Sequence, residues 1–498
     1  MDMSDAFLSQ KVEPMAKALK EMQDLEGGAI ANPDENRMVG HYWLRNPSLA
    51  PSPEIAEEII STNKRIKEFA AKVHAGEIAG SGGKFENVLL IGIGGSALGP
   101  QFVANALGQP TSDKAKLFFL DNTDPDGMDR TLDVLKAGLS RTLCIVISKS
   151  GGTKETRNGM IEAETFYANS GLDFKKHAVA ITMKGSELDK YSTNWIAQFP
   201  MWDWVGGRTS QLSAVGLLPA ALQGIDIDSL LSGASECDSV TRGTCMLDNP
   251  AAMLAAAWFW AGNGKGEKAM VVLPYKDRLE LFSKYLQQLV MESLGKELDR
   301  SGNKVNQGLT VFGNKGATDQ HSYIQQLRDG LDNFFAVFVE VLSDRQHSSV
   351  EVEASIRSGD YLNAFYMGTR KALYEGGRPS ITISVNSVSA KTVGALIALF
   401  ERAVGLYASL ININAYHQPG VQAGKIAADE VIKLKLKVLK TIKSAKEPLS
   451  VEAIGKALGS ADYESIFKLS THLAANKDHG VKVSTNGKNP VDVRFSAA

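Results

Sequence analysis

Short apolar runs alternate with helical stretches along the chain after a polar, helical segment at residues 1–75. The first of these runs are "NVLLIGI", "KLFFLDN", "TLCIVISKS" and "HAVAITM". A strand buried on both faces reads as a continuous apolar run, and parallel sheets covered by helices contain such strands. The pattern therefore predicts an α/β domain with a mainly parallel sheet over residues 76–240.

The same alternation begins again after residue 240. The runs "AMVVLPY", "GLTVFGN", "FFAVFVEV" and "SITISVN" are separated by helical segments and predict a second α/β domain at residues 241–430. Residues 391–414 are apolar over most of their length and predict a helix buried in a core or in a subunit contact. We therefore expect two α/β domains, each a mainly parallel sheet flanked by helices.

The tail at residues 431–498 has a different pattern. A lysine-rich helical stretch, "LKLKVLKTIKSAK", is followed by two short helical segments and then by "GVKVSTNGKNPVDVRF", in which Asn486-Gly487 favours a hairpin turn. Helices followed by a small hairpin predict a winged-helix-like appendage. The apolar positions between the lysines indicate that the lysines form a solvated helix face.

Charge and cysteine content limit the classes of partner. The formal net charge of the 498 residues is -2, so no overall field favours nucleic acid or an anionic membrane. Cys144, Cys237 and Cys245 have no CxxC spacing and no HExxH motif is present, so we expect neither a disulfide framework nor a metal site. The N-terminus lacks the apolar core of a signal peptide. We expect a cytoplasmic protein without membrane or nucleic acid partners.

A glycine-rich turn follows the first predicted strand in "VLLIGIGGSALGP", residues 88–100. One interpretation is a dinucleotide fingerprint, Gly92-x-Gly94-x-x-Ala97, with Asp121 after the next strand as the ribose-binding carboxylate. The other is a turn whose backbone approaches the phosphate of a different ligand. A single match of this kind is weak evidence, so the turn alone leaves both interpretations open.

A second turn, "SKSGGTKET" at residues 148–156, also follows a predicted buried strand. It offers hydroxyls and one ammonium group on Ser148, Lys149, Ser150 and Thr153. Alone it could be a helix start capped by Thr153 or Ser150. Two such turns at neighbouring strand ends can hold one phosphate from both sides, and a dinucleotide site does not need the second turn. No GxxxxGK[ST] motif is present, which excludes a P-loop.

Charged side chains elsewhere suit catalysis. Arg208 follows two glycines in "VGGRTSQLSAVGLLP" and suits stabilisation of an anion. The alternative is a surface arginine in a turn. Gln288 and Glu292 are four residues apart and share one face of an apolar helix, where a carboxylate suits general base catalysis. By sequence alone, a solvent-facing Glu292 is the simpler explanation.

The remaining candidates are polar residues near glycines. His321 lies in "GNKGATDQHSYIQQLRDG", and Gln418 and Lys425 lie in "NAYHQPGVQAGK". A lone histidine is more often structural, and a lysine is ordinarily solvated. Together, one carboxylate, one histidine, two cations and a phosphate cradle suit proton transfer beside a carbonyl through an enediolate, and this chemistry needs no cofactor.

Six motifs occur in one order over roughly residues 85–430: "IGIGGSALGP", "SKSGGTKET", "GGRTSQLSAVGLLP", "QQLVMESLGK", "QHSYIQQLRDG" and "HQPGVQAGK". In this order they resemble the phosphoglucose isomerase family of the sugar-isomerase-domain superfamily. The resemblance implies two sugar-isomerase domains, each a parallel sheet flanked by helices, in an intertwined homodimer. It also implies reversible isomerisation of glucose 6-phosphate and fructose 6-phosphate.

The resemblance assigns roles to individual residues. Glu292 matches the base that moves a proton between C1 and C2, and Arg208 matches the residue that holds the enediolate. His321 matches the ring-opening acid/base, which in this family reaches into the neighbouring subunit's site, and Lys425 matches the assisting lysine. The positions that match substrate-binding residues are Gly95, Ser96, Ser148, Lys149, Ser150, Thr153, Gln288 and Gln418.

Three positions depart from the usual family pattern. Ala97 stands where aspartate is usual, Thr209 where an aromatic residue is usual, and Leu294-Gly295 where asparagine-glycine is usual. These changes concern fine specificity more than reaction class. Two other functions remain as alternatives: a non-catalytic sugar-phosphate sensor with a DNA-binding tail, and a nicotinamide-dependent oxidoreductase built on the first turn.

Overall fold

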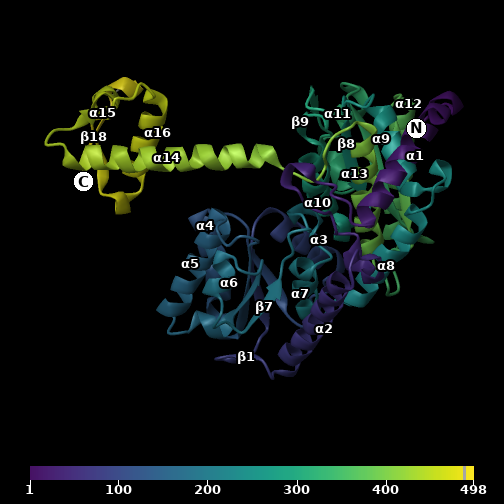
Figure 1. Cartoon of the computed structure of the whole chain (residues 1–498), viewed down its shortest axis with the longest axis horizontal. Helices are drawn as coiled ribbons and strands as arrows, with labels where there is room; N and C mark the ends of the chain where they lie inside the picture. Colours follow the sequence, from purple (N-terminus) through teal and green to yellow (C-terminus); the bar gives the residue numbers. More distant parts are fainter. Residues whose placement is uncertain (486–488) are drawn as a thin grey trace. The chain divides into compact units, whose positions relative to one another are not determined.

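The computed structural model describes residues 1–485 and 489–498, with the backbone alone at 422–423. The chain divides into two compact units, Met1–His417 and Gln418–Ala498. The first unit holds two parallel sheets, and the second holds a long helix and a small antiparallel sheet (Figure 1). The helices of the first unit are α1 (Asp5–Glu26), α2 (Pro53–Ala75), α3 (Leu98–Leu107), α4 (Pro125–Leu135), α5 (Lys154–Asn169), α6 (Glu187–Tyr191), α7 (Ala214–Gln223), α8 (Ile227–Thr241), α9 (Pro250–Ala261), α10 (Phe282–Leu286), α11 (Ile324–Asp329), α12 (Ser358–Glu375) and α13 (Ala390–Leu410).

The first sheet confirms the predicted α/β pattern. Its strands are all parallel and lie in the order β4-β3-β5-β6-β7. They are β3 (Asn87–Ile91), β4 (Lys116–Leu120), β5 (Thr142–Ile147), β6 (Ala178–Thr182) and β7 (Ala197–Pro200). Leu89 and Ile91 of β3 pack in a core with α4, α5 and α6, whereas Val88 and Leu90 face α2, α3 and α7. Helices therefore cover both faces of this sheet, which is why its strands are continuously apolar.

The sequence pattern does not predict β7, although it predicts the other strands of this sheet. This strand has four residues, ends at Pro200 and is partly exposed at the edge of the sheet. An edge strand has no need of a long apolar run, and proline is tolerated there because one side of the strand forms no ladder.

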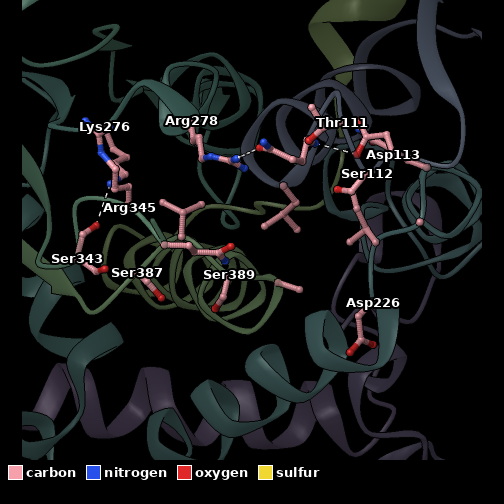
Figure 2. Close-up of a pocket in the computed structure, with 18 of the residues that line it drawn as sticks. Thr111, Ser112, Asp113, Asp226, Lys276, Arg278, Ser343, Arg345, Ser387 and Ser389 are labelled. Carbon is pink, nitrogen blue, oxygen red and sulfur yellow. Dashed lines mark hydrogen bonds between the residues drawn. The ribbon is translucent and has the colours of Figure 1, made fainter. Parts of the chain in front are cut away.

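The second sheet is also parallel, in the order β11-β8-β12-β15. Its strands, one from each predicted run, are β8 (Ala269–Pro274), β11 (Val311–Phe312), β12 (Phe334–Val341) and β15 (Ser380–Val385). One face packs with α11 and α12, and the other contributes Val272 and Val337 to the large core that the second sheet shares with the first. Residues beyond the carboxyl ends of β8, β12 and β15 line an open pocket (Figure 2).

Helix α13 is the long apolar helix that the sequence predicts. By length and composition it is apolar enough to cross a membrane, but 78% of its apolar window is buried inside the protein. It packs against α1, α8 and α9. These contacts are those of a core helix of the first unit.

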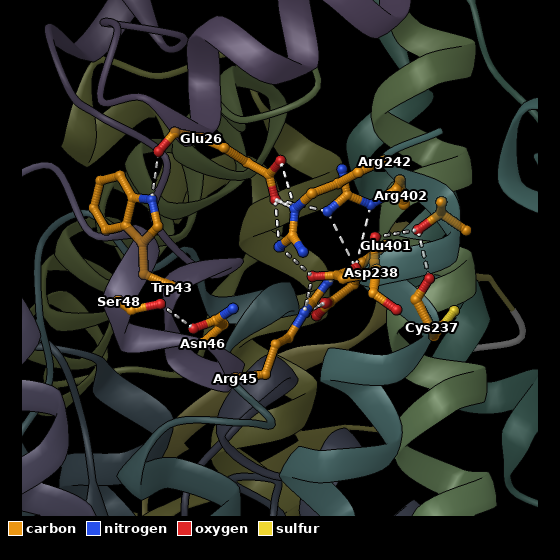
Figure 3. A network of polar contacts seen from close by, with 12 residues as sticks. Glu26, Trp43, Arg45, Asn46, Ser48, Cys237, Asp238, Arg242, Glu401 and Arg402 are labelled. Carbon is orange, nitrogen blue, oxygen red and sulfur yellow. Dashed lines mark hydrogen bonds and ion pairs between the residues drawn. The ribbon is translucent and has the colours of Figure 1, made fainter. Parts of the chain in front are cut away.

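A buried network of carboxylates and arginines joins the N-terminal segment to α8 and α13 (Figure 3). Arg45 donates to the Asp238 carboxylate at 2.6 and 3.0 Å, and also pairs with Glu401. Arg402 donates to Glu26 at 2.7 Å and to Asp238 at 3.2 Å. The members are Glu26, Arg45, Asp238, Arg242, Glu401 and Arg402. Because positive and negative groups are equal in number and hydrogen-bonded to each other, burial leaves no uncompensated charge within this set.

The second unit contains the helices and paired strands that the tail pattern predicts. Its helices are α14 (Pro419–Ser444), α15 (Val451–Leu458) and α16 (Tyr463–Ala475), and its strands are β16 (Leu449–Ser450), β17 (Val481–Thr485) and β18 (Arg494–Ala497) in the order β16-β18-β17. On α14, Val438 and Ile442 are buried while Lys437, Lys440 and Lys443 are exposed, so these lysines are solvated as predicted. The predicted turn at Asn486-Gly487 lies outside the described residues.

Candidate active site

The first glycine-rich turn lies where β3 ends and α3 begins, as the short helix η4 (Gly94–Ser96). A Cβ atom on Gly95 would lie 1.9 Å from the carbonyl oxygen of Gly207, so only glycine allows this contact. Gly94 has a φ of +58°, and a Cβ atom there would lie 3.1 Å from Nε2 of Gln288. The turn is therefore packed directly against the loop that carries Arg208 and against the segment that carries Gln288.

The second turn follows β5, the neighbour of β3 in the sheet. The hydroxyl of Ser148 accepts a hydrogen bond from N–H of Gly151 at 3.1 Å, and that of Ser150 accepts from N–H of Gly152 at 3.2 Å. Thr153 occupies the N-cap position of α5, but in the part of the chain that the structure describes its side chain makes no capping hydrogen bond. The alternative explanation, a turn whose Thr153 side chain caps the helix, is thus not supported. All three hydroxyls keep a hydrogen that can be donated to an anion.

Lys149 ties the second turn to the segment before Arg208. Its ammonium group donates to the carbonyls of Asp203 and Val205 at 2.8 and 3.2 Å. Burial lowers the pKa of Lys149 to about 8, with a further lowering from the nearby charge of Arg37. Lys149 therefore combines a structural role with a positive charge beside the turn.

Arg208 and Glu292 form an ion pair, with Nη1 of Arg208 3.1 Å from Oε2 of Glu292. Nη2 of Arg208 donates to the carbonyls of Ala415 and His417 at 2.8 and 3.0 Å. The Arg208 side chain is 6% exposed and that of Glu292 is 20% exposed, so the carboxylate is reachable from one side. Neither residue is the solvated surface group that the alternative explanations assumed.

Glu292 lies on a six-residue π-helix, η10 (Gln287–Glu292), which continues α10. Gln288, on the same π-helix, donates to Oε2 of Glu292 at 3.2 Å. Segments of π-helix are rare and are frequent at functional sites, where they re-aim side chains. The predicted pairing of Gln288 and Glu292 on one face is therefore confirmed, in a helix type that the spacing did not predict.

Lys296 also belongs to this cluster and sequence reasoning missed it. Its Nζ donates to the carbonyls of Glu292 and Ser293 at 2.8 and 2.7 Å, and the residue is 4% exposed. Burial, together with the charge of Arg208, lowers the pKa of Lys296 to about 7. Nothing in the sequence marks Lys296, because a lysine four residues after a glutamate is common on exposed helix faces.

His321 is exposed at the end of η11 (Thr318–His321). Its loop is held by Asp319, which is 1% exposed and accepts hydrogen bonds from Asn314 and Tyr323. Within the described residues, no hydrogen bond or ion pair joins His321 to Glu292. His321 is therefore exposed to solvent, on a loop that is held by hydrogen bonds to the buried Asp319.

Gln418 and Lys425 belong to the second compact unit. Gln418 is the N-cap residue of α14, and Lys425 is exposed on the second turn of that helix. Asp121, the carboxylate of the dinucleotide interpretation, accepts a hydrogen bond from Gln101 of α3 at 2.7 Å. Over the described ranges, no group of three or more His, Cys, Asp or Glu residues is arranged to hold a metal ion.

The residues that the structure brings together can perform a limited range of chemistry. Glu292, Arg208 and Gln288 are in direct contact, and the backbone of Gly95 touches that of Gly207 beside them. A reachable carboxylate held by a guanidinium suits proton transfer in which negative charge develops on a nearby oxygen. The turns at the carboxyl ends of β3 and β5 offer hydroxyl and N–H groups for an anion at the same edge of the sheet.

The model of the phosphoglucose isomerase family matches residues 6–354 and 331–447 of this chain. The match therefore includes both sheets and ends before α15.

Relatives named glucose-6-phosphate isomerase align with this chain over nearly its full length. The glucose-6-phosphate isomerase of Geobacter sulfurreducens is 60% identical over 486 residues, which cover 97% of this chain and 92% of that relative. The glucose-6-phosphate isomerase of a Nostoc species is 57% identical over 500 residues, covering 100% of this chain and 94% of the relative, so that alignment includes the tail. A crystal structure of a glucose-6-phosphate isomerase from Chlamydia trachomatis matches 85% of each chain with a TM-score of 0.76 and 27% identity. This chain belongs to the phosphoglucose isomerase family.

Proposed function

We propose that this protein interconverts glucose 6-phosphate and fructose 6-phosphate by reversible aldose–ketose isomerisation. The observation that carries the proposal is the Arg208–Glu292 ion pair beside the turn of Gly95, in a chain whose nearly full-length relatives are named glucose-6-phosphate isomerase. A base next to a fixed cation suits an enediolate, because the base removes a carbon-bound proton while the cation stabilises the oxygen that becomes negative.

In this proposal the two turns bind the phosphate group of the substrate. Ser148 and Ser150 already accept hydrogen bonds from backbone N–H groups, so each hydroxyl can donate to a phosphate oxygen. Thr153 adds a third hydroxyl at the start of α5, where the helix dipole favours an anion. Gly95, Ser96 and Lys149 complete the proposed cradle. Anchoring the phosphate fixes the position of C1 and C2 relative to Glu292.

Glu292 is the proposed base for the proton transfer. It takes the proton from C2 of the open-chain aldose, and the electron pair forms the C1–C2 double bond while negative charge develops on O1. Arg208 stabilises that oxygen. Glu292 then returns the proton to C1, and the proton of O2 moves to O1, so that C2 becomes the carbonyl carbon of the ketose. Gln288 and Gln418 are the proposed contacts to the sugar.

Ring opening needs an acid and a base before the proton transfer. We assign this step to His321, assisted by Lys425, and place His321 in the site of the neighbouring subunit. The exposure of His321 supports this assignment, since a side chain presented to solvent on a fixed loop is suited to reach a partner. Gln320, its neighbour, donates to Thr369 of α12 at 2.5 Å, which attaches the loop of His321 to that helix.

The proposed assembly is a homodimer. Helix α12 exposes large apolar side chains, and Tyr361, Phe365, Met367 and Tyr374 are 37%, 46%, 60% and 80% exposed. The nearby strand β13 (Glu351–Glu353) adds Val352, which is 51% exposed. A group of exposed apolar side chains is typical of a protein interface. We propose that a second copy of the chain covers these side chains, because a dimer would bring His321 of one subunit to the active site of the other.

The remaining parts of the proposal concern organisation and location. Residues 76–240 and 241–430 are the proposed sugar-isomerase domains, with residues 1–75 as a helical N-terminal segment and 431–498 as an appendage. The presence of one parallel sheet in each of the two ranges supports this division. The proposed location is the cytoplasm, with neither metal nor cofactor in the reaction.

A direct assay tests the proposed activity. Purified protein is incubated with fructose 6-phosphate without added metal or nucleotide, and glucose 6-phosphate is measured over time. We expect conversion in both directions toward the same ratio of the two sugars. Absence of conversion would contradict the proposal, and a saturable change of nicotinamide fluorescence on titration with NADH would favour the oxidoreductase instead.

A further inference from the structure

A second set of polar side chains gathers at the carboxyl edge of the other sheet. The pocket there has a volume of about 1010 Å³ and is formed by residues that follow three parallel strands. Lys276 follows β8, Arg345 follows β12, and Ser387 follows β15. Crevices at the carboxyl ends of parallel strands are the usual ligand sites of α/β sheets. Neither the catalytic proposal nor any residue assigned to it uses this pocket.

The cations of the pocket have neutral partners. Nζ of Lys276 donates to the carbonyls of Ser343 and Asp344, and Arg278 donates to the carbonyls of Ala106 and Gly108, each at 3.1 Å, and to the side-chain oxygen of Gln109. Carbonyl and amide oxygens satisfy hydrogen-bond donors but do not neutralise a charge. The positive charges of Lys276 and Arg278 are thus not cancelled by a direct ion pair among the described residues.

Arg345 is exposed and makes no ion pair or hydrogen bond with the described part of the chain. Figure 2 shows it beside Lys276 and Ser343, on the same side of the pocket as Arg278. Burial lowers the pKa of Lys276, the charge of Asp344 opposes this, and the nearby charges of Arg278 and Arg345 lower the pKa further. Three cations therefore form one end of the pocket.

Carboxylates also line the pocket, and two of them have other polar contacts. Asp113 accepts hydrogen bonds from N–H of Gln109 at 2.8 Å and from Gln223 at 2.9 Å. Asp226 caps α8 by accepting from Ser229. Both lie across the pocket from Lys276 and Arg345 in Figure 2. Asp344 and Asp277 partly offset the charge of Lys276. The carboxylate of Asp344 is packed against the backbone of Gly359.

The start of α13 forms another wall of the pocket. Ser389 is the N-cap residue of this 21-residue helix and accepts from N–H of Thr392 at 3.2 Å. Ser387 and Ser389 line the same pocket as the cations (Figure 2). Positive helix dipole, hydroxyl donors and cations are the groups that bind phosphate oxygens. Leu107, Ile225 and Val388 add apolar surface for an organic part of a ligand.

We propose that this pocket is a second ligand site, separate from the catalytic one, for a small molecule that bears a phosphate or pyrophosphate group. Arg345 and Lys276 contact the anion, Ser387 and the start of α13 donate to it, and the apolar wall contacts the remainder of the ligand. Arg278 mainly holds the end of α3 in place and adds positive charge.

Isothermal titration with inorganic pyrophosphate tests the proposal. The titration is made without sugar phosphate, because sugar phosphates belong to the proposed ligand class and would compete with pyrophosphate for the pocket. Substitutions in the pocket separate binding there from binding at the catalytic turns. Arg345→Glu is the test variant, because Arg345 is exposed and supports no other group. Arg130→Glu, at an exposed position of α4, is the matched control with the same change of charge.

We expect the wild-type protein and Arg130→Glu to bind pyrophosphate with equal affinity and Arg345→Glu to bind roughly tenfold or more weakly. Ser387→Glu, which places a carboxylate in the pocket, should weaken binding similarly. No binding by the wild-type protein, or equal binding by all four proteins, would overturn the proposal. Because sugar-phosphate turnover is measured separately, a failure here leaves the catalytic proposal untouched.

Discussion

Arg208 and Glu292 lie 3.1 Å apart in an ion pair that joins the loop after the first sheet to the π-helix of the second α/β half. The same guanidinium holds the carbonyls of Ala415 and His417 at the end of the first compact unit. One side chain therefore fixes three segments that are distant in the sequence. The position of the candidate base depends on all three.

Replacing Arg208 with lysine tests this dependence. Lysine keeps the charge but lacks the planar fork, so it cannot bind Glu292 and both carbonyls in the same geometry. We expect kcat to fall by about 10²-fold or more and the free energy of unfolding to fall by about 1–3 kcal/mol, because buried acceptors lose their donor. Kinetics and urea unfolding measure the two effects. Arg130→Lys should change neither quantity, and wild-type turnover in Arg208→Lys would contradict the proposed role.

The contact between Gly95 and Gly207 leads to a second prediction. A methyl group on Gly95 would meet a backbone oxygen at 1.9 Å, so the turn would have to move. We expect Gly95→Ala to raise KM for fructose 6-phosphate and to cost about 1–3 kcal/mol of stability, as overpacking does. Gly127→Ala is the matched control, because the nearest atom to its added methyl would be at 3.4 Å. Equal effects of the two substitutions would show that the contact does not position the turn.

The sheets were predictable because their strands are buried on both faces. Runs such as "TLCIVIS" and "FFAVFVEV" have no polar alternation, and they form β5 and β12. The two glycine-rich turns were also predictable, because their glycines and hydroxyl residues come directly after these apolar runs and so mark where the strands end. β7 was not predictable, because an exposed edge strand of four residues ending at Pro200 has no pattern that distinguishes it from a loop.

The candidate site was predictable only in part. The spacing of Gln288 and Glu292 places them on one face, but it does not show that Arg208 would lie against them, because that contact depends on how two α/β halves pack. The π-helix and the burial of Lys296 are also tertiary effects. The sequence favoured a solvated Glu292, and the structure corrects this, because neighbouring segments cover most of its side chain.

Lys296 leads to a prediction about pH. Burial lowers its pKa from the usual value of 10.5 to about 7, so above pH 7 the unfolded chain binds more protons at this lysine than the folded chain does. The contribution of Lys296 to stability should therefore increase as pH rises from about 7 toward 10.5. The difference in free energy of unfolding between the wild-type protein and Lys296→Met isolates this contribution from other groups. The free energy of unfolding of the wild-type protein minus that of Lys296→Met should therefore increase between pH 7 and 10. A value that stays constant or decreases over this range would show that the pKa of Lys296 is not lowered.

The proposed exchange of His321 between subunits predicts complementation. His321→Ala and Glu292→Gln should each be inactive as homodimers, since every site lacks one group. A mixed dimer would hold one site with Glu292 of one chain and His321 of the other. We expect unfolding and refolding of the two inactive variants together to restore a substantial part of the activity, whereas refolding each alone should not. Absence of recovery, with mixed dimers present, would place His321 and Glu292 of one chain in the same site.

The central claim is that Glu292 moves the proton between C1 and C2. Glu292→Gln keeps the size of the side chain and its contact with Gln288 but removes the base. The exposed Glu297→Gln is the matched control, since Glu297 pairs only with Lys304 at the surface among the described ion pairs.

The deciding measurement is kcat for conversion of fructose 6-phosphate by Glu292→Gln, together with the dissociation constant of the same sugar. We predict that kcat falls by roughly 10²–10⁴-fold while binding stays close to that of the wild-type protein, and that Glu297→Gln changes neither. A Glu292→Gln variant that turns over fructose 6-phosphate at close to the wild-type rate would contradict the account.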